Sequence, residues 1–260
     1  MRNKKVLTAV FGTAAALVLL SLAVWNAVLT SKLNKAEKMY NEQVSANERL
    51  AAMIEGGTKP SEEAEISERG IKTGIPDEIY DKIFGTTLFD NSPVKKDSLV
   101  YLTVPYYNFS GETAIGHMIV NKKAAEDVLD IFEELYKIQY PIEKMDIAEE
   151  FDSMQSALLN STELASKGYN NTCALYYSIE NGEFSPHSFG LAIDVNPKIN
   201  PSRDIYGAPV PKNAGRYANN DNLTETEQRA KITEESEIYK IFTAHGWIWD
   251  SSNPCCFIKD

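Results

Sequence analysis

The stretch that decides the fold is Ser185-Pro-His-Ser-Phe-Gly-Leu-Ala-Ile-Asp194. After its glycine, apolar residues alternate with Ala192 and Asp194, which predicts a strand that holds Asp194 on the side away from the core. His187 precedes the strand in a turn. An imidazole and a carboxylate in this arrangement suit zinc, and a catalytic zinc needs three protein ligands and one open position for water. The residues alone leave a second interpretation open, a surface turn histidine and an aspartate that ties down a loop.

The same stretch resembles the Ser-x-His-x-x-Gly-x-Ala-x-Asp motif of the zinc D-alanyl-D-alanine carboxypeptidases and L-alanyl-D-glutamate endopeptidases, which cut bacterial cell-wall peptides. The likeness continues through Asn170-Asn171-Thr172 upstream and His245-Gly-Trp-Ile-Trp249 downstream, and so covers residues 98–260. It implies an α+β fold, a small antiparallel sheet with packed helices. It also implies one zinc ion bound by two histidines and one aspartate, with an acidic general base. His187 and Asp194 fall on the first two ligand positions.

The carboxyl-terminal end departs from the family pattern. The family runs Gly-Trp-x-Trp-Gly-Gly-Asp-Trp, a short spacer and Asp-x-x-His-Phe, whereas this chain reads Gly246-Trp-Ile-Trp-Asp-Ser-Ser-Asn-Pro-Cys-Cys-Phe257. Alignment on the phenylalanine puts Cys256 at the third-ligand position, and cysteine binds zinc as its thiolate. The predicted metal ligands are therefore His187, Asp194 and Cys256.

The same alignment puts Asn253 at the general-base position. An amide can orient a water molecule but cannot take its proton. Asp250, three residues earlier, is the substitute base if the shortened loop brings it within reach. Asp250 and Asn253 are the predicted catalytic residues.

Substrate capture also departs from the pattern. The family has an arginine shortly after Asn-Asn-Thr, suited to gripping a peptide carboxylate through its planar fork. This chain has Ser178 there, and no arginine occurs between residues 171 and 194. Ser178 and the motif serine Ser185 are therefore assigned to the substrate side of the site. Arg203 and Arg216, in a later loop, are expected to be solvated surface charges, and the alternative is that they reach into the site in place of the missing arginine.

The amino terminus predicts a membrane anchor. Residues 6–31 carry no charge and are long enough to cross a bilayer as a helix. Basic residues in the tail 1–5 favour a cytoplasmic amino terminus, which puts the rest of the chain outside the bacterial cell. A cleaved signal peptide is the alternative, but its apolar region is usually only about 7 to 15 residues long.

The segments that follow are predicted to connect the anchor to the folded part. Apolar residues in 32–55 recur at helical spacing, but Asn47 interrupts them, which predicts a short helical stalk with weak self-association at most. Residues 56–76 have the composition of a flexible linker. An extracellular domain is expected over 77–260, with its core in 98–260.

Local patterns predict several elements in this domain. They are strands at 100–104 and 117–120 joined by a turn at 108–111, a helix at 124–135, an insertion at 155–169, a strand at 173–179, a turn at 180–183, a loop at 197–222, and a last helix with Thr233 as N-cap and Gly246 as its end. His245 is expected to cap that helix, and Tyr176 is assigned to the core.

Charge and cysteine content limit the partners. A net charge of −11 and a pI near 4.9 exclude nucleic acid as a partner, because phosphate binding needs clustered lysine and arginine. The cysteines are Cys173, Cys255 and Cys256, too few for a disulfide framework, although one link from Cys173 to either of the others stays open.

Two functions remain at this stage. One is a membrane-anchored zinc D,D-carboxypeptidase or endopeptidase that acts on peptidoglycan stem peptides. The other is a catalytically inactive peptidase-like module that binds cell-wall peptide or an extracellular partner. The substitutions at the base, the third ligand and the substrate arginine leave the choice open.

Overall fold

The computed structural model describes Thr30, residues 68–150 and residues 160–260. Within these residues, no helix has both the length and the apolar character needed to span a bilayer. The predicted tail 1–5, the stalk 32–55, most of the anchor 6–31 and the first part of the linker, 56–67, lie outside the described residues.

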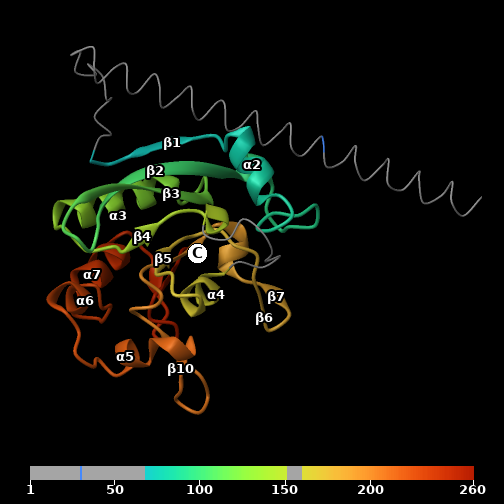
Figure 1. The fold of residues 1–260 in the computed structure, drawn as a ribbon. Coiled ribbons are helices and arrows are strands. Elements are labelled where there is room, and N and C mark those ends of the chain that lie inside the picture. Colours follow the sequence, from blue (N-terminus) through green and yellow to red (C-terminus); the bar gives the residue numbers. More distant parts are fainter. Residues whose placement is uncertain (1–29, 31–67, 151–159) are drawn as a thin grey trace, which may run out of the picture. The chain divides into compact units, whose positions relative to one another are not determined.

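The fold begins with a three-stranded antiparallel sheet of order β1-β2-β3 (Figure 1). β2 (Leu99–Tyr107) pairs along its whole length with β3 (Thr113–Asn121). The side chain of Asn108 accepts hydrogen bonds from the backbone of Ser110 and Glu112 and so closes the turn between them. The predicted hairpin is confirmed, with both strands longer than expected.

The edge strand of this sheet corrects the predicted linker. β1 (Ile71–Thr73) pairs antiparallel with β2, opposite Thr103 to Tyr101. The described fold therefore includes residues that composition assigned to the linker. The sequence did not indicate this strand, because all three β1 side chains are exposed and show no alternation of apolar and polar residues. Backbone pairing with β2 holds it in the sheet.

Helices cover both faces of the sheet. α3 (Ala125–Lys137) lies on the face formed by residues such as Val100 and Leu102, and the predicted helix is confirmed. α2 (Asp77–Ile83) belongs to a second apolar cluster, together with Leu99 and Ile119 from the other face. The short 3-10 helices are η1 (Lys96–Ser98), η2 (Ala148–Glu150), η3 (Pro186–Phe189) and η4 (Lys212–Ala214).

A second antiparallel sheet, of order β11-β12-β8, carries the site. Its strands are β11 (Ile248–Trp249), β12 (Cys256–Ile258) and β8 (Ala192–Asp194). Ile193 lies in the main core with Phe257, whose ring stacks on that of Phe242. The predicted alternation after Gly190 is confirmed, because Ile193 faces this core while Asp194 turns the other way.

The strand predicted for residues 173–179 is wrong. β5 (Asn171–Thr172) pairs in parallel with β4 (Lys144–Met145), Cys173 forms an isolated bridge with Asp194, and the chain is then irregular up to β6 (Ile179–Glu180). After Cys173, the carbonyl of Ala174 accepts a hydrogen bond from the ring of His187, and that of Ser178 accepts from the Ser188 hydroxyl and the Ser185 backbone, so neither carbonyl continues a strand ladder.

The turn predicted at 180–183 is confirmed as a hairpin. β6 pairs with β7 (Glu183–Phe184), and Asn181 and Gly182 at its tip both have positive φ, as tight hairpin turns require. Within the predicted insertion, α4 (Ser161–Ser166) is capped by the side chain of Asn160.

The loop predicted for 197–222 contains short elements. A hairpin of β9 (Ser202–Arg203) and β10 (Pro209–Val210) is followed by η4 and α5 (Gly215–Ala218). Next comes α6 (Glu225–Arg229), which the sequence analysis did not predict although Thr224 and Glu227 form a capping box.

The last helix, α7 (Glu237–Ala244), begins later than predicted. Its N-cap is Ser236. Thr233 lies before the helix in a turn, where its backbone N–H donates to the Ser236 hydroxyl and its carbonyl accepts from the same hydroxyl. His245 is the C-cap and Gly246 ends the helix with positive φ, as predicted. The described fold is thus α+β, with small, mainly antiparallel sheets and packed helices.

Candidate metal centre

Two paired strands and one tight turn position the site. Asp194 on β8 lies directly opposite Cys256 on β12 in the antiparallel register. His187 comes from η3, which Gly190 ends in the left-handed region with φ 68°. A Cβ at Gly190 would lie 2.8 Å from the backbone nitrogen of Asn121. The turn therefore needs glycine for both its backbone conformation and its close packing.

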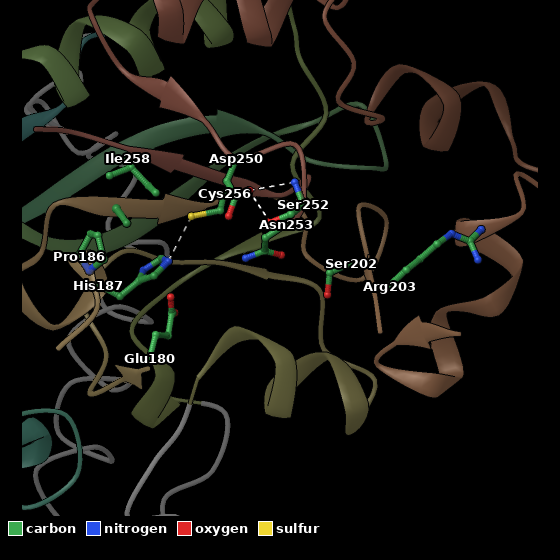
Figure 2. A pocket seen from close by; sticks show the side chains of 11 residues that line it. Glu180, Pro186, His187, Ser202, Arg203, Asp250, Ser252, Asn253, Cys256 and Ile258 are labelled. Atoms are coloured by element: carbon green, nitrogen blue, oxygen red, sulfur yellow. Dashed lines mark hydrogen bonds between the residues drawn. The ribbon is translucent and has the colours of Figure 1, made fainter. Parts of the chain in front are cut away.

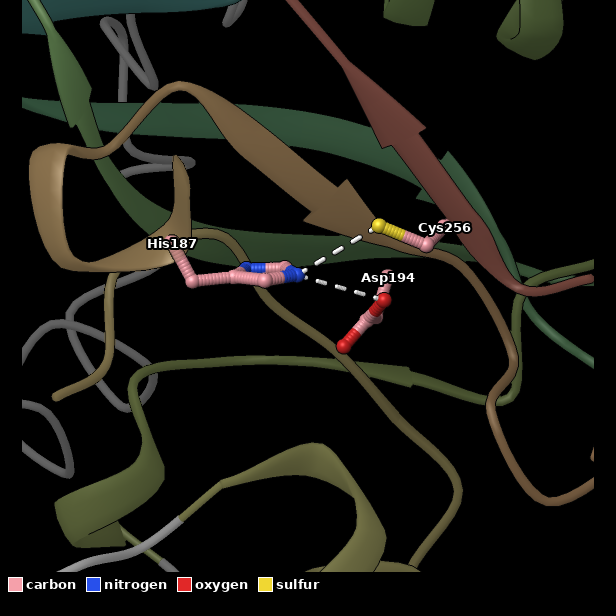
Figure 3. Close-up of side chains that lie close together, drawn as sticks. All are labelled: His187, Asp194 and Cys256. Carbon is pink, nitrogen blue, oxygen red and sulfur yellow. Dashed lines mark hydrogen bonds and ion pairs between the residues drawn. The ribbon is translucent and has the colours of Figure 1, made fainter. Parts of the chain in front are cut away.

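Three side chains converge there (Figure 3). The Nε2 atom of His187 lies 3.4 Å from Oδ1 of Asp194 and 3.5 Å from Sγ of Cys256. The three candidate ligand atoms all lie within 4.8 Å of one another, and all three residues are buried. The structure thus brings together the three residues predicted as metal ligands.

The imidazole of His187 is held in the orientation that a metal needs. Its Nδ1 lies 2.7 Å from the carbonyl oxygen of Ala174, and because a carbonyl can only accept, Nδ1 donates. In the neutral ring this leaves the lone pair on Nε2, the atom that faces Asp194 and Cys256. The ring of Tyr176 stacks on the imidazole, with 4.0 Å between centroids, and fixes its plane.

The carboxylate of Asp194 is oriented in the same way. Its Oδ2 accepts hydrogen bonds from the hydroxyl groups of Ser161 and Tyr176, the second at 2.8 Å. Its Oδ1 faces His187 and has the Cys255 thiol at 3.4 Å. Partners that saturate one oxygen and leave the other toward the site are typical of the support around a metal-binding carboxylate.

The electrostatics describe the metal-free site. Burial works to raise the pKa of Asp194, but the charge and hydrogen bond of His187, with the bonds from Ser161 and Tyr176, hold it well below its usual value. Burial works to lower the pKa of His187, but the Asp194 carboxylate outweighs it and the net pKa is raised. Burial, and then the Asp194 charge, raise the pKa of Cys256 well above the usual thiol value. These directions favour an ion pair of Asp194 and His187 beside a protonated Cys256 thiol when no metal is bound.

A cysteine, a histidine and an aspartate also suggest a nucleophilic triad, but the geometry differs. In such a triad the thiol and the acid bind opposite nitrogens of the imidazole. Here Asp194 and Cys256 both approach Nε2, and Nδ1 is bonded to Ala174. Three donors grouped around one point suit a shared cation.

A pocket opens beside the candidate ligands (Figure 2). Its volume is about 330 Å³. The residues that line it come from the β6–β7 hairpin, η3, β8, β9 and the carboxyl-terminal segment, and they are Glu180, Pro186, His187, Ala192, Ser202, Arg203, Asp250, Ser252, Asn253, Cys256 and Ile258. Two of the three candidate ligands, His187 and Cys256, therefore border the space that a ligand in this pocket would occupy.

Both predicted catalytic residues line this pocket. The Asp250 carboxylate accepts two hydrogen bonds from Ser252, one from its backbone and one from its hydroxyl, and both go to Oδ1. The backbone of Asn253 bonds to Asp250 and Cys256, which fixes the turn. The structure places both residues at the pocket, and their catalytic roles remain predictions.

The residues assigned to the substrate side lie elsewhere. Neither Ser178 nor Ser185 is among the residues that line the pocket. The backbone of Ser178 is bonded to Ser185 and Ser188, and the buried hydroxyl of Ser185 has no hydrogen-bond partner among the described residues. Their part in substrate binding remains a prediction.

The two arginines of the later loop are used locally. Arg203 lines the pocket with its stem, but its guanidinium points away and donates to the carbonyl groups of Gly207 and Ala218 (Figure 2). Arg216 forms a two-pronged ion pair with Glu227. Neither takes the place of the family arginine.

Sequence reasoning missed several members of the site. Tyr176 was assigned to the core, yet it contacts both His187 and Asp194. Ser161 lies in the insertion, where no motif marks it. Glu180 counted only as a turn residue, although it lines the pocket. Each of these residues comes from a segment outside the motif, so only the three-dimensional structure shows that it lies at the site.

The cysteines are all free and buried, so the disulfide left open by the sequence is absent. Cys173 and Cys256 flank Asp194 on opposite sides, through the bridge and the β12 register respectively. Cys255 supports Asp194 and does not belong to the group of three.

Comparison with known proteins identifies the segment that carries the site. Residues 179–251 match the family model described as D-alanyl-D-alanine carboxypeptidase. The matched segment includes His187, Asp194 and Asp250 and ends before Cys256. No curated protein and no solved structure matches the chain. The resemblance to the D-alanyl-D-alanine carboxypeptidases that the sequence predicted is therefore confirmed over residues 179–251.

Proposed function

We propose that this chain is a zinc-dependent peptidase of the D-alanyl-D-alanine carboxypeptidase type that acts on peptidoglycan stem peptides. One observation carries the proposal. Asp194 and Cys256 approach the same nitrogen of His187 while the other nitrogen is bonded to a backbone carbonyl, an arrangement suited to one shared cation. Nitrogen, oxygen and sulfur donors of this kind fit zinc.

Zinc bound there would polarise the scissile carbonyl and lower the pKa of a bound water. The chain's own residues would do the rest. Asn253 would orient the water through its amide, and Asp250 would accept its proton. Two observations support this assignment. Both residues line the pocket, and Asp250 is adjacent to Cys256, because its backbone N–H donates to the Cys256 carbonyl oxygen at 3.0 Å.

The proposed location follows from the amino-terminal sequence. An apolar run over 6–31 would anchor the chain in the bacterial membrane and place the peptidase-like part outside the cell, where stem peptides are found. The stalk 32–55 would hold it away from the bilayer, with weak self-association at most. Protease accessibility in intact cells and in lysed cells tests this orientation.

The central experiment measures metal and turnover on the same sample of the full chain. Zinc content is determined on purified protein, and release of D-alanine and cleavage of L-Ala-D-Glu bonds are followed on stem peptides. We expect one zinc per chain in the wild type and loss of both zinc and turnover in His187→Ala. His245→Ala is the matched control, because His245 caps α7 and bonds to Glu134. A wild-type protein without zinc contradicts the proposal.

A second function is favoured by a different observation. The family's base position holds the amide of Asn253, and its arginine position holds Ser178, which does not line the pocket. A peptidase-like module that binds wall peptide without cutting it would show this pattern. Zinc and peptide binding without turnover, for the wild type and for Asp250→Asn alike, would identify this second function.

A further inference from the structure

The charges in the pocket are unusual for a site that receives a peptide carboxylate. Glu180 and Asp250 both line it, from the β6–β7 hairpin and from the carboxyl-terminal segment. Figure 2 shows the Glu180 side chain directed toward the imidazole of His187. Its carboxylate makes no hydrogen bond or ion pair with any described residue. It is therefore available to a ligand.

No lysine is found among the residues that line the pocket, and the one arginine there turns its charge away. The guanidinium of Arg203 donates to the carbonyl groups of Gly207 and Ala218, the first at 2.7 Å. Ser178 stands where the family has its carboxylate-gripping arginine. Among the described residues that line the pocket, only His187 could present a positive charge to a carboxylate ligand, and its ring is neutral when it binds a metal.

A bound zinc ion would not reverse this charge. The two positive charges of zinc are balanced by the Asp194 carboxylate and a Cys256 thiolate, whereas a histidine in place of Cys256 would leave one positive charge. With the metal centre neutral, Glu180 and Asp250 give the pocket a net negative charge. A carboxylate would be repelled and an ammonium group attracted.

We infer that the pocket binds peptides through a cationic amine, held by Glu180 in a pocket that Asp250 also makes negative, and not through a terminal carboxylate. The substrate class is then a peptide that presents a free α-amino group or the side-chain amine of a diamino acid. This inference rests on the proposed function, because it concerns the substrate of the same site. Of the two cleavages tested for that function, it favours the internal L-Ala-D-Glu bond over release of the terminal D-alanine.

Four ligands distinguish the effect of the amine on binding from that of the carboxylate. They are ketomethylene analogues of D-alanyl-D-alanine, which cannot be hydrolysed, with the amine free or acetylated and the carboxylate free or converted to an amide. Calorimetry on the zinc-loaded full chain is expected to show that the analogue with a free amine and no carboxylate binds about ten-fold or more tightly than the one with a carboxylate and no amine. Added salt should reduce this preference.

Two variants assign the effect to its residue. Glu180→Gln should lose most of the preference, while Glu183→Gln should keep it. Glu183 is the matched control, because it is exposed, pairs with Glu180 in the β6–β7 register and does not line the pocket. Equal effects of the two variants would overturn the inference. So would equal or tighter binding of the carboxylate analogue, or a lack of binding by all four.

Failure of the inference and failure of the proposed activity give different results. If zinc and turnover are present but the carboxylate analogue is preferred, the inference fails and the peptidase remains. If turnover is absent but the amine preference depends on Glu180, the inference holds for a binding module.

Discussion

Asp194 and Cys256 occupy facing positions on β8 and β12, so a donor on each strand is fixed by backbone pairing and not by a flexible loop. Side chains at facing positions of antiparallel strands lie on the same side of the sheet. His187 then completes the group from the turn before β8. Only the third donor depends on a separate loop, and Gly190 fixes that turn.

Cys256 is the strongest test of the metal site. Cys256→Ser is expected to weaken zinc binding by about 100-fold or more, because a hydroxyl is a poor zinc ligand where a thiolate is a good one. Competition with a chromogenic chelator measures the affinity. Cys173→Ser is the matched control, since Cys173 is equally buried beside Asp194 but lies outside the group of three. Equal affinities in the two variants would remove Cys256 from the site.

Tyr176 is expected to support the metal through Asp194. Tyr176→Phe keeps the ring that stacks on His187 and removes only the hydroxyl that donates to Oδ2. Zinc affinity should fall about ten-fold, as is typical when a supporting hydrogen bond is lost. Tyr177→Phe is the control, because Tyr177 packs against Phe89 and Phe184 instead. An unchanged affinity would show that Ser161 alone orients the carboxylate.

Zinc uptake is expected to release protons. Metal binding needs a neutral His187 and a thiolate at Cys256, and the pKa of each is raised in the metal-free protein. Apparent zinc affinity should therefore increase as pH rises. Calorimetry in two buffers of different ionisation enthalpy gives the number of protons released, and a heat that does not depend on the buffer would contradict the expectation.

Glu227 should contribute to acid sensitivity. Hydrogen bonds from Arg216 first, and from Thr224, lower its pKa from 4.5 to about 2. Because the folded-state pKa is depressed, its stabilisation is present above about pH 4.5 and is lost as the pH falls toward 2. Glu227→Gln should lower the free energy of unfolding by about 1 kcal/mol near neutral pH, a small effect because Arg216 is partly exposed. The loss should be smaller near pH 3, where the wild-type carboxylate is itself becoming protonated. Denaturant unfolding at several pH values measures this, with Glu225→Gln as control.

Gly190 should tolerate no side chain. Gly190→Ala places a Cβ 2.8 Å from a backbone nitrogen at positive φ, so a loss of about 2 kcal/mol or more in the free energy of unfolding is expected. Gly182→Ala is the control, because it has positive φ but open space around it. A similar loss in both variants would attribute the effect to backbone strain alone.

The sequence predicted the parts of the fold that repeat a regular pattern. The β2–β3 hairpin, α3 and the alternation around Ile193 each follow from apolar periodicity, which burial enforces. The irregular segment after Cys173 was mistaken for a strand because its apolar and aromatic residues are buried without a neighbouring strand. The composition of this segment indicates that it is buried. Whether it pairs as a strand depends on residues far away in the sequence.

The site divides in the same way. The motif located His187 and Asp194, and alignment to the chain end located Cys256, because each keeps a fixed distance from a recognisable residue. Ser161 and Glu180 were missed because they approach from α4 and a hairpin, and their positions depend on tertiary packing. The sequence around Ser161 and Glu180 does not indicate that these residues lie near His187 and Asp194 in the folded protein.

The thiol of Cys256 also bears on which ion the protein would select. Sulfur is a soft donor and is a poor ligand for hard cations such as calcium and magnesium. A group containing Cys256 would therefore discriminate against those two ions and retain zinc, cobalt or cadmium. With cysteine instead of histidine at this position, the zinc centre would lose its net positive charge. In return, the site would bind softer metal ions more selectively.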